Sequence, residues 1–383
     1  MGLDEFLNAL PEDDGAPLNY ASLPELSGLT NPQAEEFGQL WLEWSDERVI
    51  ELVKRMVALC EEQPDVEFES IYRQGLVHAN AQVRLSALSG LDESGDRKLI
   101  KPFCEMMTGD PSPVVRAAAA ETLAYLSSLA QAGKLAPRDE KSLSEELFGV
   151  LGNEEEFDAV KLKALEAVSV FGGDRLVPYL EAAWSSGDMS ARQSSIYAMG
   201  RTSDPKWADR VIEDLEHDLV AVRYEATMAI GELGDEAHLR ALEVPLDDED
   251  LTVQLAAISA VEGIGGDVAK DMLELRLVSS EPRVVELVQQ ALETMKEEED
   301  LDEVVTQEMA RAMFGAGDTL PGIDTEGYEP AEIEGWANLP DPREVDDFGT
   351  GITEEAEELG LDRGDPFDID LPPEDPWDHD ENF

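Results

Sequence analysis

Apolar residues recur at helical spacing through most of the chain. From about residue 31 to residue 296 they return every three or four positions, which places them on one face of an α-helix. Short turns rich in Gly, Asp and acidic residues separate these segments, so the pattern predicts a succession of short helices. Asn31 followed by Pro32 is a favourable helix start, and the segments 31–44 and 46–62 form the first predicted pair.

The helical pattern repeats with a period of 31 residues. Successive copies begin at Val160, Ala191, Val222, Val253 and Val284, and the residue seven positions later is alanine in each copy. Two earlier copies begin at Val83 and Val115, 32 residues apart. The next step, from Val115 to Val160, is 45 residues, which indicates an insertion near 127–142. A fixed period of this length is typical of a repeat architecture.

Each repeat is predicted to be a pair of helices. The first helix follows a Gly-Asp turn, and the second carries the V-R-x-x-A-x-x-A-L pattern, whose alanines let neighbouring helices approach closely. One hairpin cannot bury its own apolar stripe, so neighbouring hairpins must stack. We therefore predict an all-α protein with an N-terminal capping helix pair at 31–62 and seven repeats at 63–296.

The repeat resembles HEAT repeats of the short 31-residue kind that phycobilin-lyase subunits also contain. The likeness rests on V-R-x-x-A-x-x-A-L-G-x-x-G-D and covers about 83–292, and the chain's layout is similar to that of bacterial HEAT-repeat proteins. It implies a right-handed α-solenoid, an armadillo-type superhelix of HEAT-like helical hairpins. It also implies that the second helices line the concave face and that the protein holds partners. Because one fold hosts many functions, the resemblance leaves the task of this chain open.

Charge divides the chain into unequal parts. The whole chain has a formal net charge of −59, and residues 297–383 alone hold 30 acidic and three basic side chains with eight prolines. Such a composition buries too little apolar surface to offset the entropy of ordering, so we predict an acidic disordered tail at 297–383. Residues 1–30 have six acidic and no basic side chains. They predict an acidic disordered N-terminal arm, in which Leu3 and Phe6 fall on one helical face that could dock.

The same charge excludes several classes of protein. A nucleic-acid binder needs a basic face, and anionic lipid would repel this chain, so no nucleic acid and no membrane are expected among its partners. The sequence has no apolar run of membrane-spanning length, no secretory signal pattern and only two cysteines. We expect a cytoplasmic protein.

In several repeats the residue directly after the repeat start is an arginine: Arg84, Arg116, Arg192 and Arg223. These four residues, called the arginine ladder below, are predicted to make structural ion pairs with turn acids such as Asp110, Asp188 and Asp218. The alternative is an anion-binding stripe, which the surrounding carboxylates disfavour.

Partner binding is the only site chemistry that the sequence favours. Positions two and six after each repeat start should face outward on the second helices, and five of them are apolar or aromatic: Leu162, Tyr197, Tyr224, Met228 and Leu255. Such residues mark a candidate binding patch, and packing under a neighbouring segment is the alternative. The tail offers a second candidate, the aromatic docking residues Trp336, Phe367, Trp377 and Phe383, set among acidic side chains.

No motif for catalysis, metal or cofactor binding is present, so none is predicted. The favoured hypothesis is a non-enzymatic scaffold or adaptor. Its solenoid would hold a protein partner with a basic or apolar surface, and its acidic tail would recruit or shield a basic one. One alternative, implied by the repeat type alone, is a bilin-lyase-like protein or an assembly factor for a pigment protein. Another is a chaperone for a basic protein such as a ribosomal protein.

Overall fold

The computed structural model describes residues 3, 6, 20–41, 43–279 and 281–297, and every regular element among them is helical. A short 3₁₀ helix, η1 (Tyr20–Leu26), precedes α2 (Asn31–Trp41) and α3 (Asp46–Glu62). The following helices are α4 (Glu69–Gly75), α5 (Ala81–Ser89), α6 (Ile100–Gly109), α7 (Pro113–Gln131), α8 (Pro137–Leu151), α9 (Asp158–Val168), α10 (Val177–Ser185) and α11 (Met189–Arg201). After them come α12 (Ala208–Ile212), α13 (Val220–Leu233), α14 (Glu243–Leu246), α15 (Leu251–Ile264), α16 (Gly266–Glu274) and a last helix over 282–297.

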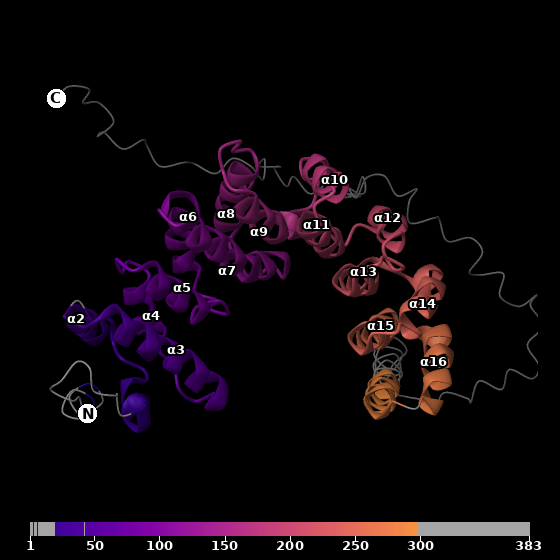
Figure 1. Ribbon diagram of the computed structural model, residues 1–383, viewed down its shortest axis with the longest axis horizontal. Coiled ribbons are helices and arrows are strands. Elements are labelled where there is room, and N and C mark those ends of the chain that lie inside the picture. The colour runs from indigo at the N-terminus through magenta and orange to yellow at the C-terminus, as the bar shows by residue number, and fades with distance from the viewer. Residues whose placement is uncertain (1–2, 4–5, 7–19, 42, 280, 298–383) are drawn as a thin grey trace, which may run out of the picture. The chain divides into compact units, whose positions relative to one another are not determined.

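The helices stack as antiparallel hairpins in two layers. The second helix of one hairpin contacts the second helix of the next, as α7 contacts α9, α11 contacts α13, and α13 contacts α15. The first helices, such as α10 and α12, lie on the other side of the stack (Figure 1). The second helices together are called the second-helix layer below. The pair α2–α3 precedes seven further hairpins, and this stack is an α-solenoid.

Small residues set the spacing within the second-helix layer. A Cβ atom built on Gly200 would lie 3.0 Å from the Cα atom of Ala229, and one on Gly231 would lie 3.0 Å from the Cα atom of Ala260. The backbones of α11, α13 and α15 therefore approach one another too closely for larger side chains. This contact accounts for two of the alanines that recur seven residues after each repeat start.

The insertion near 127–142 lengthens two helices. The second helix α7 has 19 residues against 13 in α11, and the following first helix α8 has 15 against nine in α10. A turn at Gly133, with φ of 68°, separates the two. The inserted residues thus lengthen the second helix of one hairpin and the first helix of the next, and they add no separate element.

Some first helices are less regular than predicted. After the Gly234-Asp235 turn, where one first helix is expected, the chain forms the 3₁₀ helix η5 (Glu236–Leu242) and then the four-residue α14 (Glu243–Leu246). A short first helix can satisfy its backbone with 3₁₀ turns while its buried side chains, such as Leu239 and Leu242, still reach the core.

The described residues of the N-terminal arm, Leu3, Phe6 and 20–30, are placed against the first helices, whereas disorder was predicted for all of 1–30. Within it, η1 buries Leu23 and Leu26 completely, and Leu3 and Phe6 are also buried. The Phe6 ring meets the Phe37 ring of α2 edge-on, with 5.8 Å between centroids. With Leu29, which is also buried, five apolar side chains of this acidic segment pack it against the first hairpin.

The predicted acidic tail falls almost wholly outside the described residues, since only Glu297 of 297–383 is described. The four aromatic docking candidates, Trp336, Phe367, Trp377 and Phe383, all lie outside them. In the part of the chain that the structure describes, no helix combines the length and apolar character needed to cross a bilayer.

Candidate protein-binding groove

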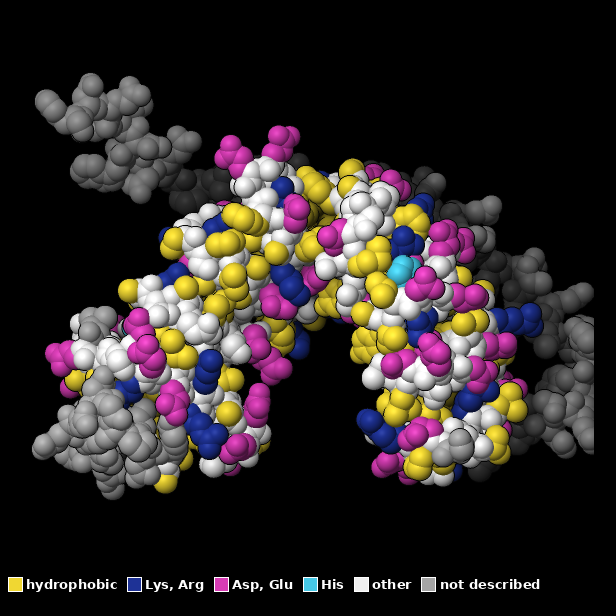
Figure 2. All heavy atoms as spheres, in the orientation of Figure 1, with side chains coloured by type: hydrophobic (Ala, Val, Ile, Leu, Met, Phe, Trp, Pro, Cys, Tyr) yellow, Lys and Arg dark blue, Asp and Glu magenta, His cyan; other side chains and the backbone are white. Residues whose placement is uncertain are grey.

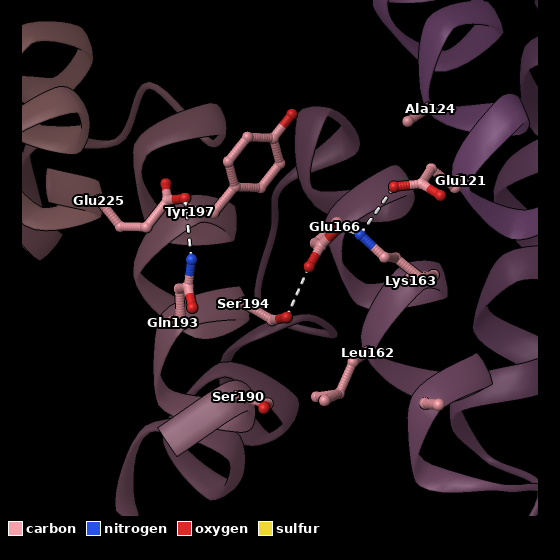
Figure 3. Close-up of a pocket in the computed structure, with 11 residues that line it drawn as sticks. Glu121, Ala124, Leu162, Lys163, Glu166, Ser190, Gln193, Ser194, Tyr197 and Glu225 are labelled. Atoms are coloured by element: carbon pink, nitrogen blue, oxygen red, sulfur yellow. Dashed lines mark hydrogen bonds and ion pairs between the residues drawn. The ribbon is translucent and has the colours of Figure 1, made fainter. Parts of the chain in front are cut away.

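A groove of about 520 Å³ opens on the second-helix layer between α7, α9 and α11. Its lining residues come from equivalent positions of successive repeats (Figure 3). Most of the side chains that line the groove besides Leu162 are polar, charged or aromatic: Glu121, Lys163, Glu166, Gln193, Ser194, Tyr197 and Glu225. The side chains stand together because the repeats stack in register, so that one face of each second helix adds to the same surface.

Lys163 of α9 lies between two carboxylates of the groove. Its Nζ atom is 2.9 Å from Glu121 Oε1 of α7 and 3.0 Å from Glu166 Oε2 of its own helix. The Ser194 hydroxyl of α11 donates a hydrogen bond of 2.5 Å to the other Glu166 oxygen. Burial alone would lower the pKa of Lys163, but the ion pairs outweigh it and raise the pKa. Lys163 therefore stays protonated and bridges the carboxylates of Glu121 and Glu166.

A smaller pocket of about 250 Å³ adjoins the groove between α11 and α13. Tyr197 lines both, and Tyr224, Glu225, Met228 and Glu232 complete the smaller one. Tyr197 and Tyr224 are each 38 % exposed although they are large aromatic residues. This pocket, with these five side chains, is called the tyrosine pocket below.

Two carboxylates of the tyrosine pocket have raised pKa values. Burial raises the pKa of Glu225, and the nearby carboxylates of Glu166 and Glu232 add to the effect, while a hydrogen bond of 3.2 Å from Gln193 Nε2 and the charge of Lys163 oppose it. Burial also raises the pKa of Glu232, against the charge of Arg201. A cation bound near these carboxylates would stabilise their ionised form.

The surface formed by the groove and the tyrosine pocket is acidic. Four glutamates, Glu121, Glu166, Glu225 and Glu232, face one lysine there, and Arg201 is 3.9 Å from Glu232 at the edge. On the face drawn in Figure 2, basic side chains are scattered singly among acidic ones. The groove thus offers an acidic surface to a ligand, with exposed aromatic rings beside it.

Of the five predicted patch residues, four lie together. Leu162 lines the groove, Tyr197 lines both cavities, and Tyr224 and Met228 line the tyrosine pocket. Leu255 on α15 is half-buried and packs against the core without lining either. Four of the five residues thus line an open surface of the second helices, and their role in partner binding stays a prediction.

The sequence reasoning missed the charged members of the groove. Glu121 and Glu166 occupy position six of their repeats, and Lys163 and Glu225 occupy position three, on the same outward face. The register that selects the tyrosines also contains these charged residues, but a charged side chain at an exposed helical position is ordinary and carries no signal of its own.

The arginine ladder joins neighbouring repeats. Arg84 makes two hydrogen bonds of 2.7 Å to the Asp110 carboxylate of the next repeat, and Arg223 makes the equivalent pair, 2.7 and 2.9 Å, with Asp248. Arg116 reaches Glu156 at 2.8 Å. Each of these three arginines also donates to backbone carbonyls of the turn before its helix.

Arg192, the fourth member of the ladder, shows how the predicted partners differ from the observed ones. It pairs at 2.8 Å with the fully buried Asp214, which was not among the turn acids named as candidate partners, and not with Asp188, which was. Asp188 instead caps α11 by accepting the Ala191 backbone N–H. Likewise Asp218 contacts Arg223 only through its backbone carbonyl oxygen, which accepts a hydrogen bond from the guanidinium. The ladder arginines thus take their carboxylate partner from the turn of the following repeat, and three of them also bind backbone carbonyls of their own turn.

The two cysteines both lie in the described part of the chain, and both are free thiols. Cys104 is buried, and burial raises its pKa to about 12. Cys60 is half-buried, and burial raises the pKa of its thiol as well. Within the described residues, no group of three or more His, Cys, Asp and Glu side chains is arranged to hold a metal ion.

The fold and the groove define an α-solenoid with a lined surface on its second-helix layer. Residues 69–139 and 208–293 match the family model for HEAT repeats, so the chain carries HEAT repeats in these two regions. A search of curated proteins by sequence finds no match.

Several solved structures are similar to this chain. The complex of CpcE and CpcF of phycocyanin lyase from Nostoc sp. is 17 % identical, with 75 % of this chain and 98 % of that chain covered and a TM-score of 0.38. Importin β is 12 % identical, with 72 % and 42 % covered and a TM-score of 0.42. Human deoxyhypusine hydroxylase is 15 % identical, with 70 % and 97 % covered and a TM-score of 0.31.

Proposed function

We propose that the protein is a non-enzymatic scaffold that holds a basic segment of a protein partner in the groove on its second-helix layer. The observation that carries this proposal is the composition of the surface formed by the groove and the tyrosine pocket, in which two exposed tyrosines lie beside four glutamates and a single lysine. Buried structural carboxylates would be paired by the ladder arginines, as Asp110 and Asp248 are. The groove carboxylates instead line an open surface.

Charge complementarity favours a basic partner over an apolar one. Unit charges about 4 Å apart near a protein surface attract by about 4 kcal/mol before desolvation, and part of this remains as affinity and as faster association. Each Lys or Arg that the partner brings to Glu225 or Glu232 also relieves the repulsion between these carboxylates. The tyrosine rings add apolar contact area at low entropic cost, which is a common property of protein-binding surfaces.

A second candidate function is the shielding of a strongly basic protein, in the manner of a chaperone. The net charge of −59 favours this function, because such a chain attracts cationic proteins over its whole surface. The two functions differ in where the partner binds, since shielding needs no particular residues of the groove. We place the protein in the cytoplasm in either case, a proposal supported by its two unpaired cysteines.

Affinity capture with a matched set of baits tests the scaffold function. The baits are the full chain, the full chain with Glu166→Lys and Glu225→Lys, and the full chain with Glu61→Lys and Glu93→Lys, two acids that line another cavity near α3 and α5. Mass spectrometry should identify partners that the first and third baits retain and the second loses. If all three baits capture the same proteins, recognition does not use the groove and general shielding is the better account.

A further inference from the structure

The tyrosine pocket combines an aromatic surface with carboxylates in a small space. Tyr197 projects from α11, while Tyr224, Met228, Glu225 and Glu232 project from α13. We propose that this pocket binds the side chain of one arginine of the partner, with the guanidinium beside the tyrosine rings and paired with Glu225. This proposal rests on the proposed function and names the residue type that the partner must carry.

The same chain already holds arginines by this chemistry at another place. The Arg192 guanidinium lies 4.3 Å from the centre of the Trp184 ring and pairs with the Asp214 carboxylate. On the same ring, Arg210 lies 4.4 Å from the centre. An aromatic face with an adjacent carboxylate therefore holds an arginine within this fold. The tyrosine pocket offers these groups with an open volume of about 250 Å³ where the guanidinium would lie.

The carboxylates of the pocket are only partly satisfied by the chain itself. Gln193 donates one neutral hydrogen bond, at 3.2 Å, to one oxygen of Glu225. Arg201 lies 3.9 Å from Glu232, and its other terminal nitrogen donates a hydrogen bond of 2.9 Å to Ser128 of α7. A carboxylate that accepts one weak hydrogen bond retains room for a charge-assisted bond from a ligand.

An arginine suits the pocket better than a lysine. The guanidinium is planar, so it can stack on a tyrosine ring while its edge donates hydrogen bonds to a carboxylate. It is also more weakly hydrated than an ammonium group, so it loses less on entering a half-buried site. The exposed side of Met228 adds an apolar surface for the methylene groups of the arginine.

The test uses the full-length protein and a short fluorescein-labelled peptide of Gly, Ser and two lysines around one arginine. In two comparison peptides, lysine or citrulline, the uncharged isostere of arginine, stands in place of the arginine. Fluorescence polarisation measures each dissociation constant. We expect the arginine peptide to bind about fivefold more tightly than the lysine peptide and more tightly still than the citrulline peptide. In protein labelled with ¹³C at methionine methyl groups, the Met228 signal, assigned with Met228→Leu, should shift on titration with the arginine peptide.

Matched variants make the test specific. Tyr224→Leu should abolish the preference for arginine over lysine, while Tyr224→Phe should keep it. Tyr125→Leu on α7 is the control, since Tyr125 is also 38 % exposed but lines neither the groove nor the tyrosine pocket. Equal unfolding midpoints for the three variants would show that the fold is intact.

The outcomes separate the two proposals. If the arginine and lysine peptides bind equally to the natural chain, or if the preference survives Tyr224→Leu, the arginine pocket is wrong. If the arginine pocket fails in either of these ways but the peptides bind Glu166→Gln more weakly than the natural chain, the basic-segment function still stands. If no peptide binds even at low salt, both proposals fail.

Discussion

The arginine ladder predicts a large and local loss of stability when one member is removed. Arg84 makes two hydrogen bonds of 2.7 Å to Asp110 and donates to the His78 and Ala79 carbonyls at 2.8 and 2.9 Å. The side chains of Arg84 and Asp110 are 9 % and 5 % exposed. Replacing Arg84 by Met keeps most of the apolar stem but leaves the Asp110 carboxylate buried without its cation. Breaking such a buried pair from one side costs about 3–5 kcal/mol of unfolding free energy.

Two further variants set the scale for this loss. Arg97→Met removes an ion pair of 3.1 Å with Asp139 from a side chain that is 67 % exposed, and should cost less than about 1 kcal/mol. Adding Asp110→Asn to Arg84→Met removes the unpaired charge but keeps an acceptor for the Ser112 backbone N–H, which Asp110 binds at 2.9 Å. The double variant should therefore regain part of the stability that Arg84→Met loses.

Hydrogen exchange measured by mass spectrometry is the appropriate assay, because repeat stacks unfold in parts and a single midpoint can conceal a local change. Amides of α5 and α6 should lose protection in Arg84→Met, while those of α13 and α15 keep it. Urea unfolding followed by circular dichroism gives the accompanying change in free energy. If Arg84→Met is no more harmful than Arg97→Met, the ladder does not hold the repeats together and the reasoning is refuted.

Three other predictions follow from burial and charge. Phe6→Ala should cost about 3 kcal/mol locally and expose α2 to hydrogen exchange, and unchanged protection would show that the N-terminal arm does not stabilise the first hairpin. Cys104, with its raised pKa, should react with iodoacetamide at pH 8 far more slowly than Cys60, and equal rates would contradict the packing around it. Binding of a basic peptide should weaken on acidification earlier than an ordinary glutamate pKa of 4.5 implies, because Glu225 and Glu232 have raised pKa values and lose their charge first. A binding profile that stays flat down to pH 4.5 would exclude these two carboxylates as the cation's partners.

The α-solenoid could be predicted from the sequence because its repeat has a strong internal signal. The alanine seven residues after each repeat start recurs for a physical reason, which the close approach of Gly200 to Ala229 makes visible. The first helices carry no comparable constraint. They are held by a few buried side chains, so their backbone takes 3₁₀ turns that periodicity does not distinguish from α-helix.

The candidate groove was only partly predictable. The outward positions of single helices could be read from the repeat register, which located Leu162, Tyr197 and Tyr224. Which residues meet across helices depends on how the repeats stack, and that places Lys163 beside Glu121, 42 residues earlier in the chain. At the N-terminus, the average composition of 1–30 predicts disorder because it is acidic. The average does not show that single apolar residues such as Leu23 and Leu26 are spaced so that they can be buried.

The central claim is that a basic partner is recognised by the groove and not by the acidic residues that follow the repeats. The most direct measurement compares the dissociation constant of one arginine-containing basic peptide for the full chain and for a chain ending at Glu297, at low and at physiological salt. We predict that at physiological salt, where long-range attraction is screened, the two constants agree within about threefold. A shortened chain that binds tenfold or more weakly at physiological salt would place recognition in residues 298–383 and contradict the claim.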